Sequence, residues 1–152
     1  MSGVGAGSER VVVVGQGYVG LALAMRAVEA GFTVVGLEED AGRVKRLAAA
    51  DSYVEDVADE TLRAALATGR YEPTTDEARC AGFDVAVIDV PTPLTDGNPN
   101  LSHVEQAARM LAGHLRRGAT VVLESTTYPG TTEELVAPIL EEGSGLAAGE
   151  DF

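Results

Sequence analysis

The sequence predicts an α/β domain in which helices cover both faces of a doubly wound parallel sheet. Three observations lead to this fold class. Short apolar runs rich in β-branched residues recur along the chain, and stretches of helical composition separate them. Several of these stretches end in glycine, a residue that often terminates helices. Strands that alternate with helices form βαβ units, and a chain of 152 residues suits one domain of this kind.

The first half of the chain is predicted to contain three strands and three helices. RVVVVG (10–15) is short, apolar and β-branched, as expected of a strand buried on both faces. The following helix closes on Gly31 and the third helix stops at Gly69. In order, we expect a strand at 10–15, a helix at 18–31, a strand at 32–40, helices at 41–49 and 56–69, and a strand at 70–76.

The second half repeats the alternation. DVAVIDV (84–90) is a further buried strand, which prolines stop, and an irregular loop rich in Pro, Gly and Asn follows at 91–100. Apolar residues three and four apart predict an amphipathic helix at 101–118. A strand at 119–125 and a last helix at 131–142, bent at Pro138, complete the pattern.

Composition narrows the classes of function. The net charge is −13, from 24 acidic against 11 basic residues, so nucleic acid and anionic membrane surfaces are not expected partners. Cys80 is the only cysteine and His103 and His114 are the only histidines, so we expect no internal disulfide and no metal site. No apolar run approaches the roughly 18 residues of a membrane span, and no signal peptide is recognisable at the N-terminus. We expect a soluble cytoplasmic protein.

The domain organisation follows from the same survey. Residues 1–9 are expected to form a flexible tail, and the GVGAG within it is no functional motif because no strand precedes it. Residues 10–152 are expected to form a single domain.

A dinucleotide-binding fingerprint stands between the first strand and the first helix. Gly15, Gly17 and Gly20 have the G-x-G-x-x-G spacing, and Glu38 ends the next strand 18 residues after Gly20. Gly15 would allow the tight turn, Gly17 the approach of a pyrophosphate, and Gly20 the packing of helix on strand. Main-chain amides at the start of the helix would bind the phosphates, which suits an acidic chain.

Glu38 indicates which dinucleotide binds. A carboxylate at this strand end accepts hydrogen bonds from the ribose hydroxyls and repels a 2′-phosphate. We therefore expect NAD in preference to NADP. Arg43, five residues later, is within reach of a phosphate. The alternative is that it is a solvated residue of the following helix.

Two further loops follow strand ends and are expected to surround the same crevice, because ligands of open parallel sheets bind beyond the carboxyl ends of the strands. They are VPTPLTDG (90–97) and ESTTYPGTT (124–132). The hydroxyls in these loops suit either contacts to a ribose, an amide and a water, or ordinary solvated turns.

Together, GQGYVGL (15–21), VPTPL (90–94) and ESTTYPGTTEE (124–134) resemble the motifs of the NAD-dependent nucleotide-sugar dehydrogenases. These are the UDP-glucose and UDP-N-acetylhexosamine 6-dehydrogenases, and the resemblance covers 10–152. It implies a Rossmann-type NAD-binding domain of a homo-oligomeric enzyme of polysaccharide biosynthesis. That enzyme would oxidise C6 of UDP-N-acetylhexosamine, UDP-glucose or a dTDP-hexose to the carboxylate with two NAD.

The resemblance also implies roles for the matching residues. Thr126 would lie beside the nicotinamide, help to hold a catalytic water and be the catalytic residue of this chain. Ser125 and Thr127 would secure their loop, and Thr131 or Thr132 would cap the last helix. The positions implied to contact the cofactor are Gly15, Gln16, Gly17, Tyr18, Val19, Gly20, Glu38, Arg43, Val90, Pro91, Thr92, Glu124 and Ser125.

Departures from the family pattern leave alternatives open. Asp89 stands where the family has a small or apolar residue or cysteine, and an acid in a buried strand needs a partner. The family's catalytic cysteine and substrate domain have no match in this chain, so we expect a fragment that is inactive alone. The alternatives are a stand-alone NAD-sensing domain and another β-hydroxyacid-type dehydrogenase.

Overall fold

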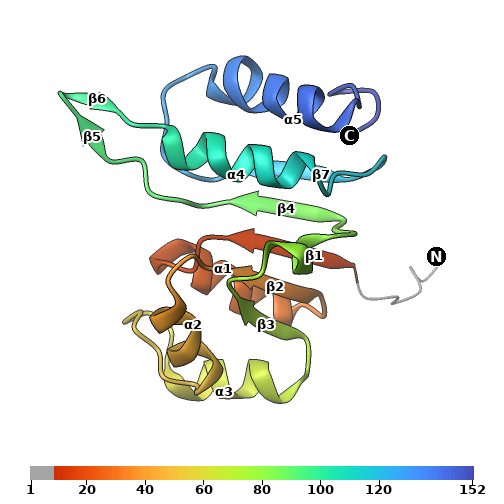
Figure 1. Cartoon of the computed structure of the whole chain (residues 1–152). Coiled ribbons are helices and arrows are strands. Elements are labelled where there is room, and N and C mark those ends of the chain that lie inside the picture. The colour runs from red at the N-terminus through yellow and green to blue at the C-terminus, as the bar shows by residue number, and fades with distance from the viewer. Residues whose placement is uncertain (1–8) are drawn as a thin grey trace.

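A computed structural model describes residues 9–152, so the tail expected at 1–9 lies, except for its last residue, outside the described part. The main sheet has five parallel strands in the order β3-β2-β1-β4-β7 (Figure 1). This order confirms the predicted fold class, since the chain winds outwards in both directions from β1. The strands are β1 (Arg10–Val14), β2 (Thr33–Leu37), β3 (Tyr71–Thr74), β4 (Val85–Ile88) and β7 (Thr120–Leu123).

The register of the sheet aligns the carboxyl ends of its strands. Val14 lies opposite both Leu37 and Ile88, and Ile88 lies opposite Leu123. The loops that follow these residues therefore leave the sheet along one edge. The winding direction reverses between β1 and β4, and a doubly wound sheet opens its ligand crevice at such a point.

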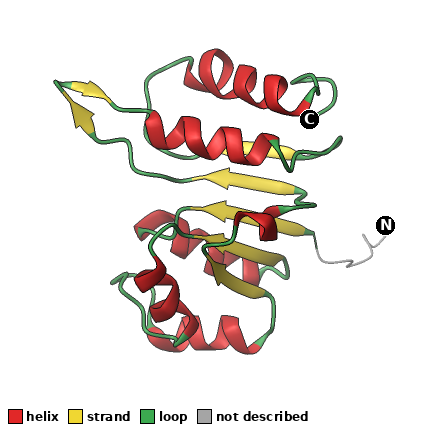
Figure 2. Ribbon diagram, in the orientation of Figure 1, coloured by secondary structure: helices red, strands yellow, loops and turns green. Residues whose placement is uncertain are grey.

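The helices divide between the two faces, as Figure 2 shows. Val11 and Val13 of β1 pack with α1 and α3, whereas Val12 and Val14 pack with α4 and α5. This alternation follows from the two-residue period of a strand, and it explains why β1 is apolar throughout. The helices are α1 (Tyr18–Glu29), α2 (Ala41–Ala48), α3 (Asp59–Ala67), α4 (Ser102–Ala112) and α5 (Ala137–Ser144), with a short 3₁₀ helix at Glu77–Cys80.

The loop after β4 and the helix that follows it differ from expectation. The loop at 91–100 contains a small antiparallel hairpin, β5 (Leu94–Thr95) and β6 (Asn98–Pro99). Its turn residues Asp96 and Gly97 have φ of 52° and 80°, and an Asp-Gly pair favours this left-handed turn. The helix expected at 101–118 ends at Ala112, because the next amides bond three residues back rather than four and tighten the last turn.

The last helix also differs from expectation. It opens with a π-helical turn at Thr132–Val136 that continues without a break into α5, in which Pro138 is the second residue. The capping expected of Thr131 or Thr132 is wrong. Thr131 occupies the first position without a capping bond, and its hydroxyl donates to the Tyr128 carbonyl at 2.7 Å. None of the helices within residues 9–152 has the length and apolar character needed to cross a membrane.

Candidate functional site

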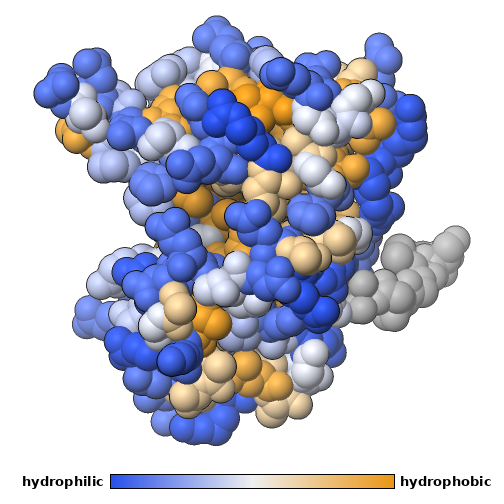
Figure 3. Space-filling view, in the orientation of Figure 1, coloured by the Kyte–Doolittle hydropathy of each residue, from blue (hydrophilic) through white to orange (hydrophobic). Residues whose placement is uncertain are grey.

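A pocket of about 410 Å³ opens at the carboxyl edge of the sheet, at the switch between β1 and β4. In Figure 3 the surface is hollowed between the part built on α1–α3 and the part built on α4 and α5. The predicted cofactor residues that line the pocket are Gly15, Gln16, Gly17, Tyr18, Val19, Glu38, Arg43, Val90 and Pro91. The fold thus brings together three segments that lie far apart in the sequence.

The three motif glycines serve different purposes. Gly15 has φ of +97°, and a Cβ on it would lie 2.0 Å from the Asp89 carbonyl oxygen. A Cβ on Gly20 would lie 2.0 Å from the Gly15 carbonyl oxygen. The fold itself therefore requires both glycines. A Cβ on Gly17 would meet nothing within 4 Å and would stand at the pocket, and φ of Gly17 is an ordinary −85°. A ligand that approaches the main chain accounts for glycine here, whereas packing does not.

The N-terminus of α1 faces this open position. Gly17 is its N-cap and offers no side chain, and the first bond within the helix runs from the Leu21 amide to the Gly17 carbonyl at 3.0 Å. Within residues 9–152 the preceding amides, those of Tyr18 and Val19, make no hydrogen bond, and they lie at the positive end of the helix dipole. The side chains of Tyr18 and Val19 are 68% and 53% exposed at the same rim. This arrangement suits a pyrophosphate with an apolar group beside it.

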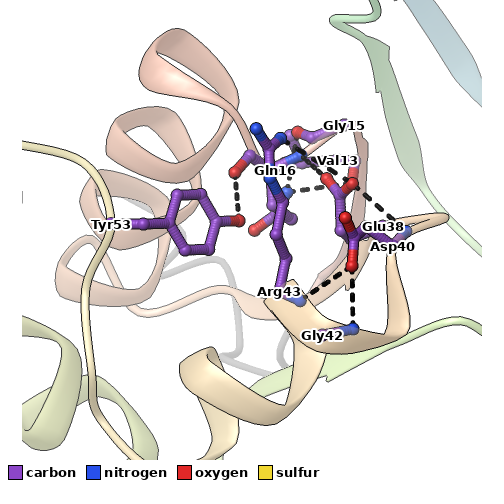
Figure 4. Close-up of polar contacts among 8 residues, drawn as sticks. All are labelled: Val13, Gly15, Gln16, Glu38, Asp40, Gly42, Arg43 and Tyr53. Atoms are coloured by element: carbon purple, nitrogen blue, oxygen red, sulfur yellow. Dashed lines mark hydrogen bonds and ion pairs between the residues drawn. The ribbon is translucent and has the colours of Figure 1, made fainter.

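Glu38 is buried in the lining of the pocket beside the glycine turn and is held from three directions (Figure 4). Its Oε2 accepts a hydrogen bond from the Gln16 amide at 3.0 Å, and its Oε1 accepts a longer one from the Asp40 amide at 3.4 Å. The Arg43 guanidinium lies 3.9 Å from Oε1. A carboxylate fixed in this way has lone pairs left for the two hydroxyls of a ribose.

Gln16 contributes its main chain to the site, because its side chain is fully buried beneath the glycine turn. Its Nε2 donates to the carbonyls of Gly15 and Val13 at 2.9 and 3.2 Å, and its Oε1 accepts from the Tyr71 hydroxyl at 2.7 Å. The side chain therefore supports the turn from below.

The loops after β4 and β7 are joined by their hydroxyls. Ser125 is buried, and its Oγ accepts from the Val90 amide at 2.9 Å and donates to the Val90 carbonyl at 2.9 Å. Thr92 Oγ1 donates to the Thr126 carbonyl at 2.7 Å. Thr92, Glu124, Ser125 and Thr126 lie beside the pocket rather than in its lining, so their cofactor contacts and the catalytic role of Thr126 stay predictions.

The partner that Asp89 needs is the main chain of α1. Its carboxylate accepts a hydrogen bond from the Gly20 backbone, while burial and the charge of Glu124 raise its pKa. The hydrogen bond opposes that rise.

Cys80 is buried in the core beneath the α4 face, and burial raises the pKa of its thiol to about 11. A thiol of this kind is protonated at neutral pH and is a poor nucleophile. The burial of Cys80 among core residues fits a structural role.

One wall of the pocket was not predicted from the sequence. It comes from the first turns of α4, with His103, Gln106, Ala107 and Met110. Since a helix that follows a strand in a βαβ unit begins at the carboxyl edge of the sheet, the position of residues 101–110 after β4 was the available signal.

The sequence of this chain is similar to those of a known enzyme family. The family model described as the NAD binding domain of the UDP-glucose/GDP-mannose dehydrogenase family matches residues 9–152. The UDP-N-acetyl-D-mannosamine dehydrogenase of Pyrococcus horikoshii is 37% identical over 94% of this chain and 34% of its own length. The UDP-N-acetyl-D-glucosamine 6-dehydrogenase of Pseudomonas aeruginosa is 40% identical over 94% of this chain and 33% of its own length. The chain therefore spans about a third of the length of these relatives.

Comparison with solved structures leads to the same family. The Pyrococcus horikoshii UDP-D-ManNAc dehydrogenase superposes with a TM-score of 0.90 at 37% identity, over 94% of this chain and 34% of that one. A ternary complex of GDP-mannose dehydrogenase from Pseudomonas aeruginosa gives 0.87 at 32% identity, over 94% and 34%. A diketoreductase, at 22% identity and a TM-score of 0.58, shares the fold alone. The chain belongs to the UDP-glucose/GDP-mannose dehydrogenase family and is its NAD-binding domain.

Proposed function

We propose that this domain binds NAD in the pocket between β1 and β4 and serves a nucleotide-sugar 6-dehydrogenase as its cofactor half. The observation that carries the proposal is the open space at Gly17, directly before the free amides of α1. The two other motif glycines are explained by packing, so Gly17 is the one whose lack of a side chain points to a ligand.

The residues present fit the cofactor at both ends of the pocket. The pyrophosphate would lie at the amides of Tyr18 and Val19, and Glu38 would accept bonds from the adenosine ribose. The loops held together by Ser125 and Thr92 would border the nicotinamide, with Thr126 beside it. Bound NAD would supply the hydride acceptor for oxidation of an alcohol. The chain's own contribution is to bind and orient it.

The substrate we propose is a nucleotide-activated hexose that is oxidised at C6 to the carboxylate. Relatives at 35–40% identity are named for UDP-N-acetyl-D-mannosamine, UDP-N-acetyl-D-glucosamine and GDP-mannose. Among these a UDP-N-acetylhexosamine is our first choice, on the likeness to the two UDP-N-acetyl relatives. A homo-oligomeric assembly, a role in polysaccharide biosynthesis and a cytoplasmic location belong to the same proposal.

The test of the ribose position is Glu38→Ala. Hydrogen bonds to a charged group contribute roughly 1.5–3 kcal/mol, so the affinity for NAD should fall about 10- to 100-fold. The affinity for NADP should fall less or rise, because a charge that repels its 2′-phosphate is gone. Calorimetry with both dinucleotides measures the two changes. Glu142→Ala is the control, since it makes an equal change of charge on the exposed surface of α5, and it should alter neither affinity. Equal affinity of the parent for NAD and NADP would show that Glu38 does not select the cofactor.

A second expected result concerns turnover by residues 1–152 alone. We expect them to bind NAD and to form no NADH from UDP- or dTDP-hexoses, because the buried thiol of Cys80 cannot capture an aldehyde. NADH absorbance over a panel of sugar nucleotides measures this. Sustained NADH formation that Cys80→Ala abolishes would contradict it.

A further inference from the structure

Tyr53 stands directly behind the adenosine end of the pocket, in the segment between α2 and α3 (Figure 4). Its hydroxyl donates to the main-chain carbonyl of Gln16, 37 residues away, at 2.5 Å. Burial, followed by the negative charge of Glu38, raises the pKa of Tyr53 to about 12. The hydroxyl is therefore a proton donor throughout the neutral range, and it holds the glycine turn from the side.

The ring of Tyr53 makes a second contact. The guanidinium carbon of Arg43 lies 4.9 Å from the ring centroid, and that of Arg46 lies 5.6 Å from it, both within the range of a cation–π attraction. The two arginines differ in what else they bind. Arg46 makes a bidentate ion pair with Asp51, with bonds of 2.7 and 3.1 Å. Arg43 has instead the looser 3.9 Å approach to Glu38 and lines the pocket.

Arg43 thus has a guanidinium that is placed beside the ribose position and held there by the ring of Tyr53 and the carboxylate of Glu38. A guanidinium binds phosphate readily. The charge of Glu38, whose Oε1 lies 3.9 Å from the Arg43 guanidinium, offsets that of Arg43 and would repel a 2′-phosphate.

We propose that Tyr53 is a positioning residue that fixes the glycine turn through its hydroxyl and Arg43 through its ring. It thereby keeps in place a 2′-phosphate site that Glu38 conceals. The ligand class of this concealed site is a 2′-phosphorylated adenosine dinucleotide such as NADP. The inference rests on the proposed NAD site and adds to it the origin of its selectivity.

The experiment measures the dissociation constants of NAD and NADP by calorimetry for Tyr53→Phe and Tyr53→Leu, each alone and combined with Glu38→Ala. Phenylalanine removes the hydroxyl and keeps the ring, so NAD affinity should fall about 2- to 10-fold, as for one neutral hydrogen bond. In the Glu38→Ala background, the ratio of NADP to NAD affinity should rise about 10-fold or more. Tyr53→Phe should keep that rise, and Tyr53→Leu and Arg43→Met should each reduce it to the part that follows from the loss of the Glu38 charge and its ribose bonds alone.

Tyr71→Phe is the matched control. It also removes a hydroxyl bonded to Gln16, but one that donates to the side chain and whose ring is not the one beneath Arg43, so the rise in the NADP ratio should survive even where the melting temperature falls. A rise of undiminished size in Tyr53→Leu or in Arg43→Met overturns the proposal for the ring and Arg43. Unchanged NAD affinity in Tyr53→Phe overturns the proposal for the hydroxyl. A parent protein that binds no NAD would contradict the proposed function itself, which separates the two failures.

Discussion

Gly17→Val is expected to weaken NAD binding roughly 100-fold or more and to leave the melting temperature of the domain unchanged. The side chain would project into the pocket at the start of α1, where the pyrophosphate is proposed to lie. It would remove one or two hydrogen bonds to a charged group, each contributing roughly 1.5–3 kcal/mol. The fold leaves room for the branch point of the side chain, because no atom lies within 4 Å of the added Cβ and φ is −85°.

Calorimetry and thermal unfolding of the same preparations separate binding from folding. Gly17→Ala provides a graded comparison, since one methyl group should weaken NAD less than an isopropyl group does. Equal affinities of all three proteins would show that the phosphates lie elsewhere, even if the fold is intact.

Gly20→Ala, unlike Gly17→Val, is expected to cause a large loss of stability. Its Cβ would lie 2.0 Å from the Gly15 carbonyl oxygen, a main-chain atom that cannot swing away. Forced overpacking of this kind costs about 3 kcal/mol or more, so the melting temperature should fall by roughly 6–12 °C for a domain of this size.

Urea unfolding measures this loss directly, and Gly17→Ala is the matched control because it adds the same methyl group three residues earlier. A midpoint equal to that of the parent would mean that α1 can move away from β1. The close packing of helix and strand would then not be what requires Gly20.

The sequence predicts most of this fold because buried parallel strands must be apolar along their whole length. Val11 to Val14 alternate between the two cores, as the residues of a strand covered by helices on both faces must. The glycine spacing and Glu38 likewise point to one end of the sheet. By contrast, the hairpin at 94–99 has two-residue strands, too short to give any periodic signal.

The supporting contacts of the site are harder to read from a sequence. Asp89 bonds to the Gly20 backbone, and Tyr53 holds Gln16 and Arg43. Each of these pairs joins segments brought together by the winding of the sheet, and local pattern carries no information about which distant residues meet. The hydroxyls of the loop at 124–132 were noticeable in the sequence, but the structure was needed to show that Ser125 bonds to Val90.

The bonds between the loops after β4 and β7 have a consequence for the entropy of binding. Ser125 and Thr92 link the two loops without any ligand, so their backbone is ordered before the cofactor arrives. Ordering flexible segments upon association would otherwise be subtracted from the affinity. Here the two loops lose that conformational entropy during folding. The hydroxyls of Ser125 and Thr92 need not touch the nicotinamide, and they would still strengthen its binding by limiting the conformations of the loops before the cofactor binds.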